Sequence, residues 1–199
     1  MKRIVVGVAG FLGSGKSTVG ASFGKLGAFV IDADKVVDAL YGTDRDGFKR
    51  IRDFFGEEYV TKRGELNRKK LAKVVFNDPK KLKILNALIH PLVTTEIQKM
   101  IDQTRSGFVV VEATYFERKF LKSLINFLLW VETPMETAFQ RVHARDGMTR
   151  EMFEKIRRLQ VKPENIDEVL LNDGSMERLD EQVAVIYRQV STMNFSKAP

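Results

Sequence analysis

The sequence predicts an α/β protein with a parallel, five-stranded sheet. Two observations support this fold class: short apolar runs alternate with segments of helical periodicity, and a glycine-rich loop joins the first run to the first helix. With 199 residues, of which 44% are hydrophobic, the chain is long enough for one α/β domain with helical insertions. Parallel sheets of this kind bind ligands at the carboxyl ends of their strands, so polar residues at those ends are candidates for function.

Five short, largely apolar runs are expected to form the strands, and the first of them is rich in β-branched residues. They cover residues 4–9, 28–31, 108–112, 127–131 and 168–171. Apolar positions at helical spacing predict a helix from Lys16 to Leu26, and Gly27 is its stop signal. The chain is therefore expected to begin with the order strand, loop, helix.

Two later helices have clear signals. Thr133-Pro134-Met135-Glu136 has the pattern of a capping box with proline at the first helical position, so a helix is expected to begin there. The final helix places four apolar residues on one stripe, namely Leu179, Val183, Ile186 and Val190. Such a stripe is typical of a packing face, so no chemical role is expected for it.

The stretch between the second and third strands, about residues 35–107, is much longer than one crossover helix requires and is predicted to be an inserted subdomain. Its apolar residues fall at helical spacing in three groups. These are Phe48, Ile51 and Phe55; Leu71, Val74 and Val75; and Leu82, Leu85, Leu88 and Ile89. Asn77-Asp78-Pro79 is a helix start, and His90-Pro91 is expected between two helices, with a capping or core role for the histidine.

Composition excludes several classes of function. The chain has no cysteine, which excludes disulfides, thiolate nucleophiles and cysteine-ligated metals and favours a cytoplasmic location. Its apolar runs are too short to span a bilayer, so no membrane association is expected. The net charge of +7 suggests anionic partners, but the basic residues are interspersed with acids, so no nucleic acid is expected. The oligomeric state is left open.

Residues 10–17, GFLGSGKS, match the pattern G-x-x-x-x-G-K-[ST], for which a purely structural glycine turn is the alternative. Glycines let backbone N–H groups turn inward around phosphate oxygens, and the following helix directs its positive end at the same anion. Lys16 adds a charge near the β- and γ-phosphates, and the Ser17 hydroxyl can ligate Mg²⁺. The residues predicted to bind ATP here are Gly10, Leu12, Gly13, Ser14, Gly15, Lys16, Ser17 and Thr18.

Asp32 and Asp34 follow the second strand, which ends next to this loop in a parallel sheet. Either carboxylate could accept a proton from an attacking hydroxyl, and Asp34 is predicted to be the base. The alternative for each acid is that it only caps the following helix. Because the two acids stand at alternate positions, at least one of them is expected to face the site.

Charged residues also follow the third and fourth strands. Glu112 ends the third strand, where an acid can orient Mg²⁺ or its water, although a partly solvated glutamate is the alternative. Arg141 and Arg145 share one helix face and could neutralise charge on a triphosphate in the transition state, with Arg150 in the turn beyond. The alternative for these arginines is an ordinary solvated face.

An ordered set of motifs, from residue 4 to about residue 185, resembles dephospho-coenzyme A kinase. The set comprises GFLGSGKST, VIDAD at 30–34, GELNRKKL at 64–71, LIHP at 88–91, and Gln140-Arg141, Arg145, Gln160 and Asn172. The resemblance implies a three-layer P-loop kinase with strand order 2-3-1-4-5. It also implies transfer of phosphate from ATP, with Mg²⁺, to the ribose 3′-hydroxyl of dephospho-coenzyme A, the last step of coenzyme A synthesis.

The resemblance assigns roles position by position. The catalytic residues would be Asp34, Lys16, Arg141 and Arg145. The acceptor would meet Asp32, Asp34, Arg68, His90 and Glu112, and Mg²⁺ would be held by Ser17 and, through water, by Glu112. Arg141 would also contact ATP, and Asn172 would lie near the adenine.

The implied division of the chain has three parts. Residues 1–34, 108–140 and 161–199 would form the nucleotide-binding core, residues 35–107 a helical acceptor-binding domain, and residues 141–160 a small lid. The chain departs from the family pattern at Phe11, where the family usually has glycine, at ATYFE (113–117) and at IDEVLLN (166–172). Two other functions stay open: another small-metabolite or nucleotide kinase, and a nucleotide-regulated nucleic-acid-binding protein.

Overall fold

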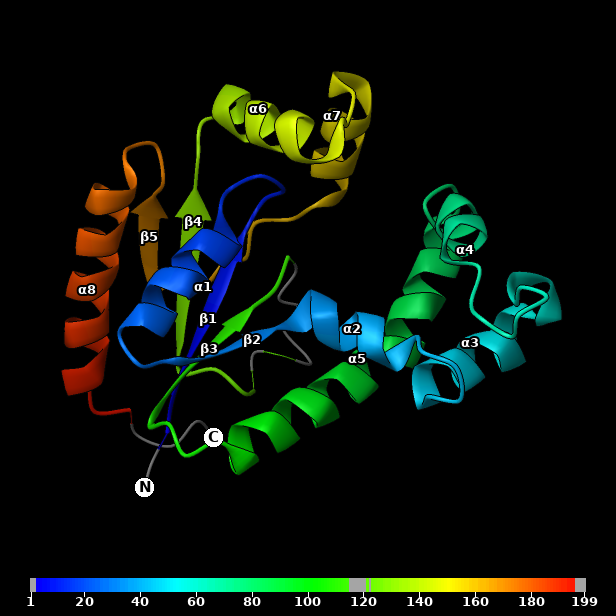
Figure 1. Cartoon of the computed structure of the whole chain (residues 1–199), viewed down its shortest axis with the longest axis horizontal. Coiled ribbons are helices and arrows are strands. Elements are labelled where there is room, and N and C mark those ends of the chain that lie inside the picture. Colours follow the sequence, from blue (N-terminus) through cyan, green and yellow to red (C-terminus); the bar gives the residue numbers. More distant parts are fainter. Residues whose placement is uncertain (1–2, 115–120, 122, 196–199) are drawn as a thin grey trace. The chain divides into compact units, whose positions relative to one another are not determined.

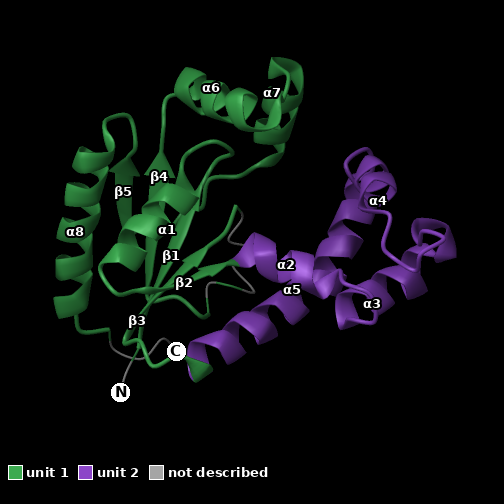
Figure 2. Cartoon of the chain, in the orientation of Figure 1, with its two compact units in different colours: residues 1–32, 103–199 green, residues 33–102 purple. Residues whose placement is uncertain are grey.

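The computed structural model describes residues 3–114, 121 and 123–195 (Figure 1). The chain divides into two compact units, one formed by residues 1–32 and 103–199 and the other by residues 33–102 (Figure 2). The second unit is inserted between two strands of the first, because β2 (Phe29–Asp32) ends where it begins and β3 (Phe108–Glu112) follows where it ends. Most of the departure at residues 113–117 lies outside the described residues.

The first unit is built on a parallel sheet of five strands in the order β2-β3-β1-β4-β5 (Figure 1). The central strand, β1 (Ile4–Gly10), lies between β3 and β4 (Phe127–Glu132), and β5 (Glu168–Leu171) forms one edge. The strand order and direction confirm the predicted fold class. The spans of β3 and β5 agree with the sequence prediction residue for residue.

One face of this sheet is covered by α1 (Lys16–Lys25) and α8 (Met176–Thr192), as Figure 1 shows. Strand residues such as Val8, Val110 and Leu129 form one buried cluster with residues of both helices. The predicted apolar stripe of the last helix is its buried face, formed by Leu179, Val183, Ile186 and Val190. Burying each such side chain contributes on the order of 1.5–3 kcal/mol to folding, so packing holds this helix in place.

The first unit also contains α6 (Met135–Asp146) and α7 (Arg150–Leu159). A helix begins where the capping box predicts one, but the cap itself is wrong: Pro134 is the N-cap residue. The Thr133 hydroxyl does not cap the helix, because it lies 2.9 Å from the backbone oxygen of Ser14 and 3.0 Å from that of Asn172, which share its one proton. Two long-range acceptors therefore replace the local cap.

The second unit is helical, as its sequence pattern predicts. Its elements are α2 (Ala33–Leu40), α3 (Asp46–Phe55), a 3₁₀ turn η1 (Glu57–Tyr59), α4 (Arg68–Val75) and α5 (Pro79–Gln103). Asp78 caps α5 as expected, since its Oδ1 accepts from the N–H groups of Lys80 and Lys81 at 3.0 and 3.2 Å. The unit begins and ends earlier in the chain than the predicted span 35–107.

The break expected at His90-Pro91 is wrong, because α5 continues through Pro91. Buried residues recur every four positions on both sides of the proline, at Leu85, Ile89, Val93, Ile97 and Ile101. Pro91 has no N–H to donate to the carbonyl oxygen four residues earlier, so the helix loses one backbone hydrogen bond there. In the following turn the Thr94 and Thr95 hydroxyls add contacts to the backbone oxygens of His90 at 3.0 Å and of Pro91 at 2.9 Å. Burial of a continuous stripe thus outweighs the cost of the proline.

The longest helix of the described residues, α5, carries too many polar side chains to cross a membrane. Within the part of the chain that the structure describes, no other helix is long and apolar enough to do so either.

Candidate functional site

The glycine-rich loop joins β1 to α1 and is shaped by close backbone contacts. Gly13 and Gly15 have φ angles of +80° and +89°, which other residues rarely adopt. A Cβ atom on Gly15 would lie 2.2 Å from Nδ2 of Asn172, and one on Gly10 would lie 2.6 Å from the carbonyl oxygen of Val131. The loop therefore requires glycine for both its conformation and its space.

The charges of this loop favour an anion. Gly15 is the N-cap residue of α1, so the positive end of the helix begins directly at the loop. The Lys16 ammonium group is folded over the loop and donates to the carbonyl oxygens of Gly10 at 3.0 Å and of Phe11 at 3.3 Å. The Ser17 side chain lies in the first turn of α1 and is exposed.

Asn172 is buried and bound to the loop from the end of β5. Its side-chain amide donates to the carbonyl oxygen of Ser14 at 2.9 Å, and its backbone N–H donates to Glu132 at 2.8 Å. The Thr133 hydroxyl joins the same carbonyl oxygen of Ser14 to that of Asn172. The sequence pattern predicts only a capping role for Thr133, because contacts with residues 119 and 39 positions away leave no local signal.

Arg141 and Arg145 lie on α6, as predicted, but in different surroundings. Nη1 of Arg141 lies beside Gly15, 3.5 Å from the point where a Cβ atom would stand if that glycine were another residue. Among the described residues, this buried Nη1 has no hydrogen-bond partner. Arg145 is exposed and bound to its neighbour Asp146 through two contacts of 2.8 and 2.7 Å. This hydrogen-bonded pair raises the pKa of Arg145 and lowers the pKa of Asp146. Of these two arginines, only Arg141 thus reaches the loop.

Arg150 is directed to the start of α6. Its guanidinium donates to both carboxylate oxygens of Glu136 at 2.9 and 2.7 Å and lies 4.1 Å from the ring centre of Phe139. Since this ion pair is exposed, it contributes little to stability.

Glu112 and Asp32 end neighbouring parallel strands and are register partners. Glu112 is 6% exposed and is packed against α1: a Cβ on Gly20 would lie 1.7 Å from its Oε1. Register partners of a parallel pair point to the same side of the sheet, so Asp32 also faces the side of α1. Two carboxylates therefore stand on the side of the sheet where the loop leads into α1.

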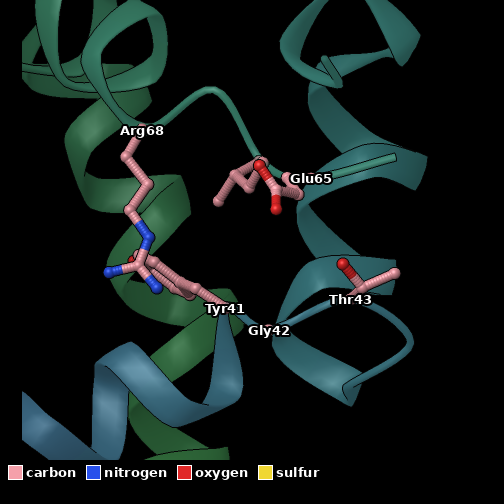
Figure 3. A pocket seen from close by; sticks show the side chains of 6 residues that line it. Tyr41, Gly42, Thr43, Glu65 and Arg68 are labelled. Carbon is pink, nitrogen blue, oxygen red and sulfur yellow. The ribbon is translucent and has the colours of Figure 1, made fainter. Parts of the chain in front are cut away.

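The second unit holds its own polar pocket, of about 320 Å³ (Figure 3). Arg68, the first residue of α4, donates to the carboxylate of Asp38 and, at 2.9 Å, to its backbone oxygen. Figure 3 shows its guanidinium beside the ring of Tyr41, whose centre is 5.4 Å away. Burial raises the pKa of Tyr41 to about 12. The pocket is lined by Tyr41, Gly42, Thr43, Glu65, Leu66 and Arg68.

The remaining predicted residues of this unit lie on helices outside that lining. Asp34 is exposed in the first turn of α2, two residues after the strand end that Asp32 occupies. His90 is half-buried inside α5.

The second histidine of the chain, His143, belongs to the first unit. It is exposed on α6, where its Nδ1 lies 3.0 Å from the backbone oxygen of Met148.

Comparison with known proteins gives a consistent set of relatives. Residues 4–178 match the family model described as dephospho-CoA kinase. The chain is 35% identical over 189 residues to the dephospho-CoA kinase of Idiomarina loihiensis, covering 93% of this chain and 94% of that one. It is 33% identical to the Escherichia coli K12 dephospho-CoA kinase, with coverage of 93% and 92%.

Solved structures give the same fold. A Thermus thermophilus protein superposes with a TM-score of 0.82 at 29% identity, covering 98% of this chain and all of the other. A Campylobacter jejuni dephospho-CoA kinase follows with a TM-score of 0.64 at 22% identity, covering 94% and 96%. Shikimate kinase from Acinetobacter baumannii, at 17% identity and a TM-score of 0.56, shares the fold alone.

Proposed function

Because the chain belongs to the dephospho-CoA kinase family, we propose that it transfers the γ-phosphate of ATP to the ribose 3′-hydroxyl of dephospho-coenzyme A, giving coenzyme A. The observation that carries the proposal is the extent of the family match. It runs from residue 4 to residue 178 and so includes both the glycine-rich loop and the whole helical unit of residues 33–102. A match limited to the loop would have indicated only a phosphate-binding protein.

The first unit would hold ATP. The backbone N–H groups of the loop and the positive end of α1 would bind the β- and γ-phosphates, together with the Lys16 ammonium group. Lys16 reaches the carbonyl oxygens of Gly10 and Phe11 and can turn from them to a phosphate without a change of backbone. Asn172, beside the loop at the end of β5, would border the adenine.

Arg141 is the arginine best placed to meet the triphosphate. Its guanidinium lies against Gly15, and among the described residues one of its buried donor atoms has no partner. A donor left unsatisfied is costly, so a phosphate oxygen that accepts from Arg141 would be bound strongly. Arg145 would first have to leave Asp146. We assign both residues to a lid of residues 141–160, with Arg141 as the direct contact.

The residues present fit a Mg²⁺ ion that arrives with ATP. Within residues 3–114, 121 and 123–195 no cluster of three acidic or histidine side chains could hold a metal by itself. Mg²⁺ commonly takes one or two protein ligands plus phosphate oxygens and water. The Ser17 hydroxyl would be the direct ligand and Glu112, packed against α1, would act through water. The bound ion would neutralise charge on the transferred phosphate.

The acceptor would be bound by the helical unit. The pocket there offers the Arg68 guanidinium, which suits the diphosphate of the acceptor, and Tyr41 and Thr43 as polar partners. Asp34, directly after the Asp32 strand end, would take the proton of the 3′-hydroxyl as the oxygen attacks the γ-phosphate. His90 and Asp32 would contribute further acceptor contacts.

A direct test is an assay of the purified protein with ATP, Mg²⁺ and a panel of acceptors. The panel holds dephospho-coenzyme A, adenosine and nucleoside monophosphates, which would reveal another metabolite kinase. We expect turnover of dephospho-coenzyme A with coenzyme A as the product, identified by its mass and by the position of the new phosphate. An enzyme that phosphorylates another acceptor and leaves dephospho-coenzyme A unchanged would refute the proposal.

A further inference from the structure

The segment between α7 and β5 returns beside the glycine-rich loop (Figure 1) and is bonded to it. The backbone N–H of Leu12 donates to Oε1 of Gln160 at 2.9 Å. The Leu12 side chain packs against a buried cluster that joins α6 to α7, formed by Ala138, Val142 and Phe153. The first half of the loop is thus attached to the end of α7 by a hydrogen bond and to the α6–α7 cluster by apolar packing.

Phe11, the residue before Leu12, is held between a second aromatic ring and a cation. Its ring meets that of Trp130 edge-on, with centres 4.9 Å apart, and the Arg157 guanidinium lies 4.6 Å from its centre. Arg157 is also 5.6 Å from the ring centre of Phe153. In the described part of the chain no carboxylate pairs with Arg157, so the two ring faces are what attract its charge. Burial lowers the pKa of this arginine.

The backbone of Phe11 connects this contact to Lys16. The carbonyl oxygen of Phe11 accepts from the Ser14 N–H at 3.1 Å and from the Lys16 ammonium group at 3.3 Å. Contacts that fix the Phe11 ring therefore also fix the Phe11 carbonyl group, which accepts two hydrogen bonds within the loop. Glycine at position 11, as the family pattern has it, would offer no ring and more backbone freedom.

We propose that Phe11, Arg157 and Gln160 form a clamp that positions the nucleotide loop. The three residues act through the loop backbone and not on the phosphates, so they are positioning residues. They order the loop before a nucleotide binds. Part of the entropic cost of ordering the loop is therefore absent from the free energy of nucleotide binding. The inference rests on the proposed function only in that the loop binds a nucleotide.

The test measures the Kd of ADP with Mg²⁺ by calorimetry, without any acceptor. We expect Arg157→Met to weaken ADP binding about three- to tenfold through loss of the cation–ring contact. Gln160→Met, which keeps the side-chain length but removes the acceptor oxygen, should have an effect of about the same size. The matched control is Arg158→Met, since Arg158 is the next residue of α7, is 81% exposed and pairs with Glu154. Equal Kd values for Arg157→Met and the control would overturn the clamp.

A double-mutant cycle separates positioning from direct contact. Phe11→Leu removes the ring face and should weaken ADP binding to the same extent as Arg157→Met, whereas Phe11→Tyr keeps the face and should restore the wild-type Kd. The double variant Phe11→Leu/Arg157→Met should bind no more weakly than the weaker single variant. If the two losses multiply, Phe11 and Arg157 act independently of each other and the clamp is rejected. A wild-type protein that binds ADP but leaves dephospho-coenzyme A unchanged would refute only the proposed acceptor.

Discussion

The sheet unit and the helical unit hold their polar groups by different means. In the sheet unit the groups are fixed by backbone: two glycines at positive φ shape the loop, and Asn172 is buried against the carbonyl oxygen of Ser14. In the helical unit they are fixed by other side chains, as Arg68 is by Asp38 and Tyr41. Backbone geometry allows almost no substitution, whereas exposed side-chain pairs can be exchanged at small cost. Four substitutions test this difference.

The largest effect should come from Asp34→Asn, which removes the proposed base. We expect kcat to fall about 10²–10⁴-fold, the usual contribution of a general base, with the Kd of ATP unchanged. Steady-state kinetics and calorimetry measure the two quantities. The matched control is Asp38→Asn, four residues further along α2, which should leave kcat within about tenfold. A kcat equal to that of the wild type would exclude Asp34 as the base.

The next largest effect concerns the loop. Gly15→Ala forces φ of +89° on alanine and places a methyl group 2.2 Å from Asn172, so the Kd of ATP should rise about a hundredfold. Gly27→Ala is the control, because Gly27 has φ of +93° and its Cβ would meet nothing within 4 Å among the described residues. It should lose about 1 kcal/mol of stability and no affinity. Equal affinities for the two variants would show that the close contact with Asn172 is unimportant.

A smaller effect is expected for stability. Thr133→Val removes the hydroxyl proton from between the carbonyl oxygens of Ser14 and Asn172. The Ser14 oxygen keeps the Asn172 amide as a donor, but the Asn172 oxygen loses its hydroxyl contact, so the free energy of unfolding should fall by about 1–3 kcal/mol. Thr95→Val removes one exposed hydroxyl contact on α5 and should cost less than about 0.5 kcal/mol. Urea unfolding of both variants measures the difference. Equal losses would contradict the view that backbone contacts dominate the sheet unit.

The smallest effect should be that of Arg68→Met. We expect KM for dephospho-coenzyme A to rise about tenfold, the size of one charge-assisted hydrogen bond, with KM for ATP unchanged. Arg52→Met is a close match, because Arg52 also pairs with an aspartate and lies over a ring but does not line the pocket. An equal rise in both variants would mean that the pocket has no special role.

The fold was readable from sequence where structure depends on local pattern. The spans of β3 and β5 follow from short, largely apolar runs, and the stripe of α8 follows from helical spacing. The predicted cap at Thr133 and the predicted helix break at Pro91 are wrong because both depend on distant groups. The Thr133 hydroxyl contacts carbonyl oxygens of other segments, and a buried apolar stripe keeps α5 helical through Pro91. A local sequence pattern shows which residue could form a hydrogen bond or a helix end, but it does not show which distant group that residue contacts.

The candidate site shows the same limit. The glycine pattern identifies the loop, and strand ends identify Asp32 and Glu112 as candidates. That Arg141 reaches Gly15 while Arg145 is occupied by Asp146 could not be read from their shared helix face. A spacing of four residues places two arginines on one side of a helix, but tertiary contacts decide which one meets the loop.

The contact between Phe11 and Trp130 gives the chain an internal optical probe. Trp130 is the only tryptophan among the 199 residues, it is 1% exposed, and it touches the second residue of the glycine-rich loop. All tryptophan emission of the protein therefore originates in one buried environment beside that loop. Movements of the loop can be followed in the unlabelled enzyme by fluorescence, with no background from other positions.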